Sequence, residues 1–168
     1  TGVQTCALPI SNVGGTETVL RLAGTGRYCK AVHYVSSLAV FLSAAHAKAP
    51  VILESDRPSD RLKGGYKQSK WVAEQLIATA HQRGLPTTTY RIGRIMGHSV
   101  TGINGNLSDF LCSLLQGCLR LGQYPLSESL INLVPLDYVS RALVGLGQTL
   151  DRAQTWGKTL RSEEHTSE

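Results

Sequence analysis

Tyr66 and Lys70 stand four residues apart in the segment GYKQSKWVAEQL, residues 65–76. Side chains with this spacing lie on one face of a helix, about 5–6 Å apart. A free tyrosine has a pKa of about 10 and exchanges its proton poorly at neutral pH, but a neighbouring ammonium stabilises the phenolate. Tyr66 is therefore a candidate general acid. The pair alone is weak evidence, because two solvated residues on an ordinary amphipathic helix have the same spacing.

Ser37 is a second candidate for chemistry. It ends a β-branched and aromatic run, residues 30–37, which predicts a short buried strand. In open α/β sheets ligands bind at the carboxyl ends of the strands, and a hydroxyl there can donate to a developing oxyanion. A serine in this position can equally cap a turn or a helix. The run YRIGRI, residues 90–95, leaves another predicted strand at the same edge of the sheet.

Alternating helices and strands are predicted to position these residues. The hydrophobic periodicity predicts helices at residues 12–23, 66–83, 108–121 and 137–150. Asp137 is the expected cap of the last helix. Short β-rich runs predict strands at residues 30–37, 87–93 and 130–134. This alternation predicts parallel strands in an α/β layer fold.

A long loop is predicted before the Tyr66 helix. Residues 47–65 contain Pro50, Pro58 and the pair Gly64 and Gly65, and they have no hydrophobic period. The loop leads directly into the helix that carries Tyr66. It could therefore serve as a lid over a site at the start of that helix, or simply be a surface loop.

The two ends of the chain are predicted to be non-native. The peptide TGVQTCALPI translates one strand of a common sequencing adapter, and RSEEHTSE translates the opposite strand. Two unrelated protein segments have no reason to encode complementary strands, so we set aside residues 1–11 and 161–168 as tails. Residues 12–160 are then expected to be part of a longer protein. Without one basic and three acidic tail residues, the net charge rises from +5 to +7.

Composition limits the classes of function. The chain has 168 residues, of which 42% are hydrophobic and 17% charged, enough for one globular domain with a core. No apolar run approaches the roughly 20 residues of a membrane span. The basic residues are scattered, which fits an anionic ligand better than nucleic acid. Cys29, Cys112 and Cys118 lack the spacing of a metal or disulfide set, and we expect buried thiols of a cytoplasmic protein.

Five segments taken together resemble a known family. In order and spacing they are similar to the extended short-chain dehydrogenase/reductases, and most of all to the thioester reductase domains that end many nonribosomal peptide and polyketide synthetases and carboxylic acid reductases. The segments are NVGGTETVLRLA, HYVSSLAVF, GYKQSKWVAEQL, YRIGRIMG and LINLVPLDYVSRALV. The resemblance implies the C-terminal part of a Rossmann-like, doubly wound parallel sheet. It also implies truncation, because no glycine-rich dinucleotide fingerprint follows a strand in this chain.

The resemblance implies a role for each candidate residue. Ser37 matches the residue that holds the substrate carbonyl, and Tyr66 matches the proton donor. Lys70 matches the lysine that binds the nicotinamide ribose. Asn12 matches a helix asparagine that anchors a water near that lysine.

The resemblance further implies a cofactor site in which Ser36, Ile92 and Gly93 join Tyr66 and Lys70. Ile92 departs from the family, which usually has proline before this glycine, and the change would free a backbone N–H and loosen the loop. The implied cofactor is NADPH. The implied substrate is an acyl or peptidyl thioester on the phosphopantetheine arm of a carrier domain, released as an aldehyde or an alcohol.

Other functions remain open at the level of sequence. A fatty acyl-CoA reductase and a nucleotide-sugar epimerase or dehydratase share the same family. A dinucleotide-binding protein without turnover is a further alternative, although it would not need Ser37, Tyr66 and Lys70 together. We expect the 168-residue chain by itself to be inactive, because the part that binds the pyrophosphate of the cofactor would lie upstream of Asn12.

Overall fold

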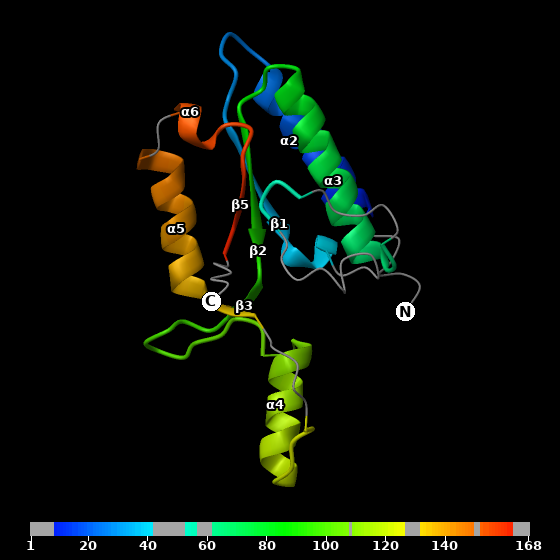
Figure 1. Cartoon of the computed structure of the whole chain (residues 1–168), viewed down its shortest axis with the longest axis vertical. Helices are drawn as coiled ribbons and strands as arrows, with labels where there is room; N and C mark the ends of the chain where they lie inside the picture. Colours follow the sequence, from blue (N-terminus) through cyan, green and yellow to red (C-terminus); the bar gives the residue numbers. More distant parts are fainter. Residues whose placement is uncertain are drawn as a thin grey trace.

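A parallel sheet forms the centre of the molecule in the computed structural model, which describes residues 9–41, 53–56, 62–107, 109–126, 132–149 and 152–162. Its three strands have the order β1-β2-β5. They are β1 (Val32–Ser37), β2 (Thr87–Ile92) and β5 (Thr159–Arg161). The sheet lies between two layers of helices, so the predicted α/β fold with parallel strands is confirmed (Figure 1).

The two helical layers each form part of the core. On one side of the sheet lie α2 (Gly15–Gly24) and α3 (Gly65–Gln82), and on the other lie α5 (Leu136–Thr149) and the short α6 (Arg152–Thr155) (Figure 1). The first layer packs around Ala23, Val32 and Ile77. The second layer packs around Tyr90, Ile92, Val134 and Val139. The sheet is therefore covered on both faces, as expected for parallel strands.

β2 is the central strand, and it aligns the ends of its neighbours. All six of its residues are buried. In the register of the β1–β2 ladder, Ser37 pairs with Ile92, so both strands end at the same edge of the sheet. This confirms the prediction that Ser37 and the YRIGRI run share one edge. β5 pairs with β2 on the other side, from Thr89↔Thr159 to Arg91↔Arg161.

A second, smaller sheet was missed in the sequence. The strand predicted at residues 87–93 ends at Ile92, and after Gly93 the chain continues as β3 (Arg94–Met96). β3 pairs in parallel with β4 (Leu133–Pro135). β4 overlaps the strand predicted at residues 130–134, of which residues 130 and 131 lie outside the described part of the chain. β5 was missed as well. Strands of three residues are too short to show an alternating pattern, which is why the sequences of β3 and β5 gave no signal.

The helix boundaries differ slightly from those predicted. The helix expected at residues 12–23 starts as a π-helical segment, η1 (Pro9–Gly14), before α2 begins. α4 (Phe110–Leu121) begins two residues later than the predicted helix. Asp109 caps it by accepting a hydrogen bond from the Leu111 N–H. Within the loop predicted at residues 47–65, the described residues 53–56 and 62–64 form no helix or strand. The rest of that loop, and with it the idea of a lid, lies outside the described residues.

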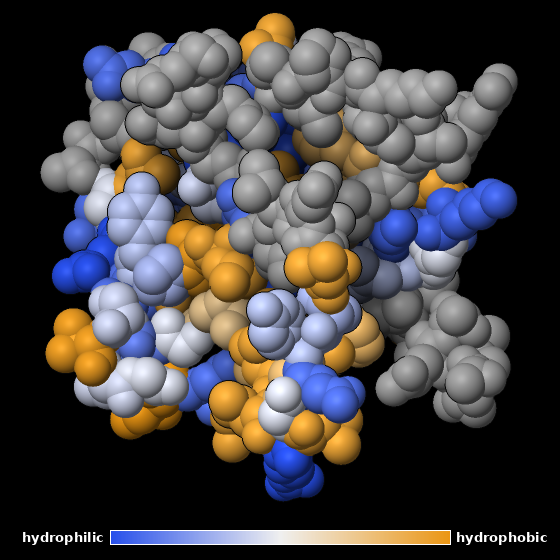
Figure 2. All heavy atoms as spheres, turned by 60° about the horizontal axis from the view of Figure 1, so that its bottom comes forward, coloured by the Kyte–Doolittle hydropathy of each residue, from blue (hydrophilic) through white to orange (hydrophobic). Residues whose placement is uncertain are grey.

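α4 projects from the body of the molecule (Figure 1). Its apolar side chains are largely exposed, at 73% for Phe110, 83% for Leu119 and 76% for Leu121. Figure 2, which brings this end of the molecule forward, shows hydrophobic side chains gathered there. An apolar face of this kind is normally covered by another part of a protein.

The cysteines correct one expectation. Cys112 is buried and Cys118 is half-buried, but Cys29 is exposed in the turn between α2 and β1. The prediction of three buried thiols is therefore wrong for Cys29. Within the described ranges no group of three or more His, Cys, Asp or Glu side chains could hold a metal ion. No helix in those ranges is long and apolar enough to cross a membrane.

Candidate active site

Tyr66 lies in the first turn of α3. The helix begins at Gly65, and Gly64 before it has a φ of 95°, a conformation that only glycine adopts without strain. The Tyr66 side chain is 44% exposed and is therefore open to a ligand. The amino end of a helix carries a partial positive charge, which favours an anion such as a phenolate. Position and exposure both suit a residue that exchanges a proton with a bound substrate.

Lys70 reaches from α3 to Val35, two residues before the end of β1. Its Nζ donates a hydrogen bond to the Val35 carbonyl oxygen at 3.0 Å and lies 5.2 Å from the centre of the Tyr34 ring. Burial lowers the pKa of the Lys70 ammonium, while the Glu74 carboxylate opposes this effect. An ammonium has three N–H donors, so two remain for a ligand after the contact with Val35.

Ser37 caps a turn, which is one of the two roles that its sequence position suggested. Its Oγ accepts a hydrogen bond from the Ala39 N–H at 3.2 Å and so caps the 3₁₀ turn η2 (Leu38–Phe41). The hydroxyl proton takes no part in that bond. Ser37 is thus oriented by the turn and can still donate to an oxygen at the carboxyl end of the sheet.

Asn12 contacts the same helix through a residue that the sequence analysis missed. Its Nδ2 donates to Ser69 Oγ at 2.9 Å, and Ser69 Oγ donates to the Tyr66 carbonyl oxygen at 2.9 Å. Asn12 therefore ties η1 to the turn of α3 that carries Tyr66 and Lys70. Ser69 is buried on the inner face of α3. In the sequence, only its position on the apolar face of an amphipathic helix indicated that it could have such a contact.

The predicted cofactor residues lie at the edge where β1 and β2 end. Ser36 is buried, and its Oγ has no hydrogen-bond partner among the described residues. Ile92 is the buried last residue of β2. A Cβ on Gly93 would overlap the Asn132 side chain, and the Gly93 N–H donates to Ser162 Oγ at 2.9 Å. The buried Ser36 hydroxyl, which needs a partner, fits the nicotinamide end of the implied cofactor. The space beside Gly93 is instead filled by the Asn132 side chain.

Tyr34 is a second tyrosine near Lys70. Burial raises its pKa far above the ordinary value of 10, and the charges of Glu74 and Tyr66 raise this pKa further. Its hydroxyl is buried and has no partner within the described part of the chain. Tyr34 therefore stays neutral and provides a ring under the Lys70 ammonium. Tyr66 is the better candidate for a proton donor of the two, because it is exposed.

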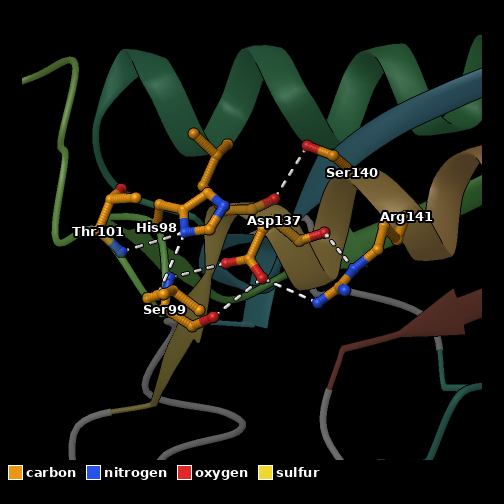
Figure 3. Close-up of polar contacts among 8 residues, drawn as sticks. His98, Ser99, Thr101, Asp137, Ser140 and Arg141 are labelled. Atoms are coloured by element: carbon orange, nitrogen blue, oxygen red, sulfur yellow. Dashed lines mark hydrogen bonds and ion pairs between the residues drawn. The ribbon is translucent and has the colours of Figure 1, made fainter.

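Asp137 corrects another expectation. α5 begins at Leu136, so Asp137 lies inside the first turn and is not the cap. Its carboxylate accepts from the Ser99 N–H at 2.8 Å and the Ser99 hydroxyl at 3.0 Å, and it pairs with Arg141 at 2.8 Å (Figure 3). It therefore holds the loop after β3 against α5. Ser99 and Asp137 are 38 residues apart in the chain, so no local sequence pattern predicts their hydrogen bond.

The pH dependence of this contact can be predicted. The Ser99 N–H is the main cause that holds the pKa of the Asp137 carboxyl below its ordinary value of 3.8. The stabilisation is therefore complete above that value and is lost as the pH falls through the lower pKa of the folded state. The unfolding temperature of Asp137→Asn should lie below that of the wild type at pH 6, and the gap should close in acid. Ser140→Ala is the control, since it loses one hydrogen bond but no charge. A difference in unfolding temperature between Asp137→Asn and the wild type that stays the same at every pH would contradict the assignment.

A parallel α/β sheet with a Tyr-x-x-x-Lys helix at the carboxyl ends of its strands defines a class of protein, the NAD(P)-binding short-chain dehydrogenase/reductases. A comparison with protein families gives the particular family. The family model described as "Male sterility protein" matches residues 6–143. The chain belongs to this NAD(P)-binding family, in its branch of thioester reductase domains.

Known relatives agree with this assignment. The terminal R domain of the myxalamid polyketide synthase–nonribosomal peptide synthetase pathway is 44% identical, with a TM-score of 0.79, over 90% of this chain and 37% of that structure's chain. Glycine betaine reductase ATRR of Emericella nidulans is 39% identical over 152 residues, 89% of this chain and 12% of that protein. The nonribosomal peptide synthetase asaC of Aspergillus flavus is 39% identical over 142 residues, 80% of this chain and 14% of that protein. The chain thus spans well under half of each relative.

Proposed function

We propose that the chain is part of an NADPH-dependent reductase domain that releases an acyl or peptidyl thioester from a carrier protein as an aldehyde or an alcohol. One arrangement supports this most. The Lys70 ammonium donates a hydrogen bond to the Val35 carbonyl oxygen near the end of β1, and Lys70 is one helical turn from Tyr66. The relatives named above support it too, since they include a terminal R domain, a reductase and a peptide synthetase. The reaction is expected in the cytoplasm, with the carrier domain in the same polypeptide.

The residues of this chain act on the thioester carbonyl. When bound, the reduced nicotinamide supplies a hydride to the carbonyl carbon. The Ser37 and Tyr66 hydroxyls donate hydrogen bonds to the carbonyl oxygen as negative charge develops there. Tyr66 passes its proton to this oxygen, and the Lys70 ammonium offsets the charge left on the phenolate. The hemithioacetal then breaks its C–S bond, so that the aldehyde carbonyl forms and the hydroxyl proton leaves with the phosphopantetheine thiol.

The residues present fit one end of the cofactor only. We assign Lys70, Tyr66 and Ser36 to the nicotinamide and its ribose, since Lys70 has N–H donors left over and the buried Ser36 hydroxyl has no partner among the described residues. The glycine-rich turn that binds a pyrophosphate in Rossmann folds is not in this sequence. β1 is an edge strand of the described sheet, and its Val35 is 41% exposed, which suits a strand with further partners in a longer domain. We therefore propose that the 168-residue chain is inactive alone.

The test is an assay of a complete reductase domain that contains this segment. NADPH oxidation is followed with an acyl thioester on a phosphopantetheinylated carrier protein, and the product is identified by mass spectrometry. We expect NADPH consumption together with release of aldehyde or alcohol. Thiol release without NADPH consumption, or equal turnover of a nucleotide sugar, would refute the proposal. The 168-residue chain should bind NADPH weakly or not at all in a fluorescence titration, and tight binding would contradict its predicted inactivity.

A further inference from the structure

A buried ion pair lies one helical turn along α3 from Lys70 and two turns from Tyr66. Glu74 follows Lys70 by one turn of α3, and its carboxylate lies 3.0 Å from Arg91 Nη2 on β2. The two side chains are only 6% and 5% exposed. Arg91 Nε also donates to both carboxylate oxygens, at 3.2 and 3.3 Å. Contacts from two guanidinium nitrogens fix the geometry of the pair.

Arg91 joins further segments to this pair. Its Nη1 donates to the carbonyl oxygens of Glu54 at 3.2 Å and Asp56 at 3.0 Å. Its guanidinium carbon lies 4.7 Å from the centre of the Phe41 ring. Phe41 ends the turn that Ser37 caps, and Glu54 and Asp56 belong to the stretch 53–56 before α3. One side chain therefore links β2, α3, the Ser37 turn and the stretch that leads towards Tyr66.

Glu74 also acts on Lys70. Tyr66, Lys70 and Glu74 follow one another at intervals of four residues, so they share one face of α3. The Glu74 carboxylate raises the pKa of the Lys70 ammonium against the larger, opposite effect of burial. Among the described residues, the titratable groups that face Lys70 are Tyr66 and Glu74 on α3, Tyr34 on β1 and, across Glu74, Arg91 on β2.

We propose that the Glu74–Arg91 pair is a positioning device for the reductase site, an inference that rests on the function proposed above. Arg91 holds the Ser37 turn and residues 53–56 against α3. Glu74 places a carboxylate one helical turn from Lys70, on the face of α3 that also carries Tyr66. A buried ion pair contributes little more stability than apolar side chains of the same size, so stability alone gives no reason for charges at this place.

The test compares three variants with the wild type in the complete reductase domain. Glu74→Gln keeps the shape of the side chain and removes its charge. The double variant Glu74→Leu/Arg91→Met replaces the pair by apolar side chains of similar size. Ile77→Ala is the matched control, because Ile77 is buried on the same helix and carries no charge. Each protein is measured for its unfolding temperature, the pH profile of kcat and the hydrogen exchange of residues 53–56.

The expected results separate positioning from stability. In Glu74→Gln, the alkaline limb of the kcat profile moves to lower pH by about 0.5–1 unit, because no carboxylate favours the Lys70 ammonium. In the double variant this limb moves in the same direction, and the amides of residues 53–56 exchange at least about tenfold faster. Ile77→Ala lowers the unfolding temperature but changes neither the limb nor that exchange rate.

Two results would overturn the positioning role. One is a folded double variant with the pH profile and the exchange of the wild type. The other is failure of both Glu74 variants to fold, which would assign the pair to stability alone. An inactive wild-type domain would overturn the reductase function itself, whereas an active wild-type domain with unshifted variants would overturn only the positioning role.

Discussion

Tyr66→Phe in the complete reductase domain is expected to lower kcat by about 10²–10⁴-fold, with little change in NADPH affinity. The substitution removes only the hydroxyl that gives its proton to the carbonyl oxygen. The ring stays in the first turn of α3, and Lys70 keeps its contacts with the Val35 carbonyl and the Tyr34 ring. NADPH oxidation measures the first quantity, and a fluorescence titration measures the second.

Tyr124→Phe is the matched control for this experiment. Tyr124 follows the end of α4, away from β1 and α3, and is 80% exposed. The kcat of Tyr124→Phe should therefore equal that of the wild type. Wild-type turnover by Tyr66→Phe would mean that another group donates the proton. Tyr34 would be the next residue to replace, although its raised pKa and its burial make it a poor donor.

Arg91→Met is expected to destabilise the chain by about 3–5 kcal/mol, because it leaves the Glu74 carboxylate buried without its partner. The loss is a large fraction of the roughly 5–15 kcal/mol that holds a typical domain folded. The carbonyl oxygens of Glu54 and Asp56 lose their donor at the same time. Urea denaturation measured by circular dichroism gives the free energy of unfolding of each protein.

Two further variants make this prediction specific. Glu74→Leu/Arg91→Met should recover most of the lost stability, because no unpaired charge remains. Arg21→Met removes an exposed partner of Glu17 and should cost about 0.3–0.5 kcal/mol. If Arg91→Met were no more destabilising than Arg21→Met, the Glu74–Arg91 pair would not be buried as the structure shows.

The spacing of hydrophobic residues along the sequence predicted the longer helices and strands well. α3 extends over Gly65–Gln82 against a prediction of residues 66–83, because Ala73 and Ile77 repeat on its buried face and Gly84 follows its end. β1 and β2 were predicted from β-branched residues, and the buried strand that these suggest is found in β2, whereas His33 and Val35 of β1 are exposed. The three-residue strands β3, β4 and β5 contain less than two full alternations, and they exist only because a neighbouring strand pairs with them.

The candidate site was predictable only where its residues belong to one element. The spacing of Tyr66 and Lys70 places them together on any helix, whatever surrounds it. The partners of Lys70 on β1, 35 residues away, depend on how α3 packs against the sheet. The contact of Asn12 with Ser69 spans 57 residues and depends on the same packing.

The sequence by itself therefore determined the order of the elements, the parallel α/β class and the residues that could carry the chemistry. Local properties are enough for these conclusions, since helix and strand periods and side-chain types act over a few residues. Only the tertiary structure decided that Glu74 pairs with Arg91 behind Lys70, and that Asp137 holds Ser99. The Glu74–Arg91 contact arises because distant segments exclude water together, and burial then forces each charged side chain to find a partner. The Asp137–Ser99 contact depends on how the loop after β3 lies against α5.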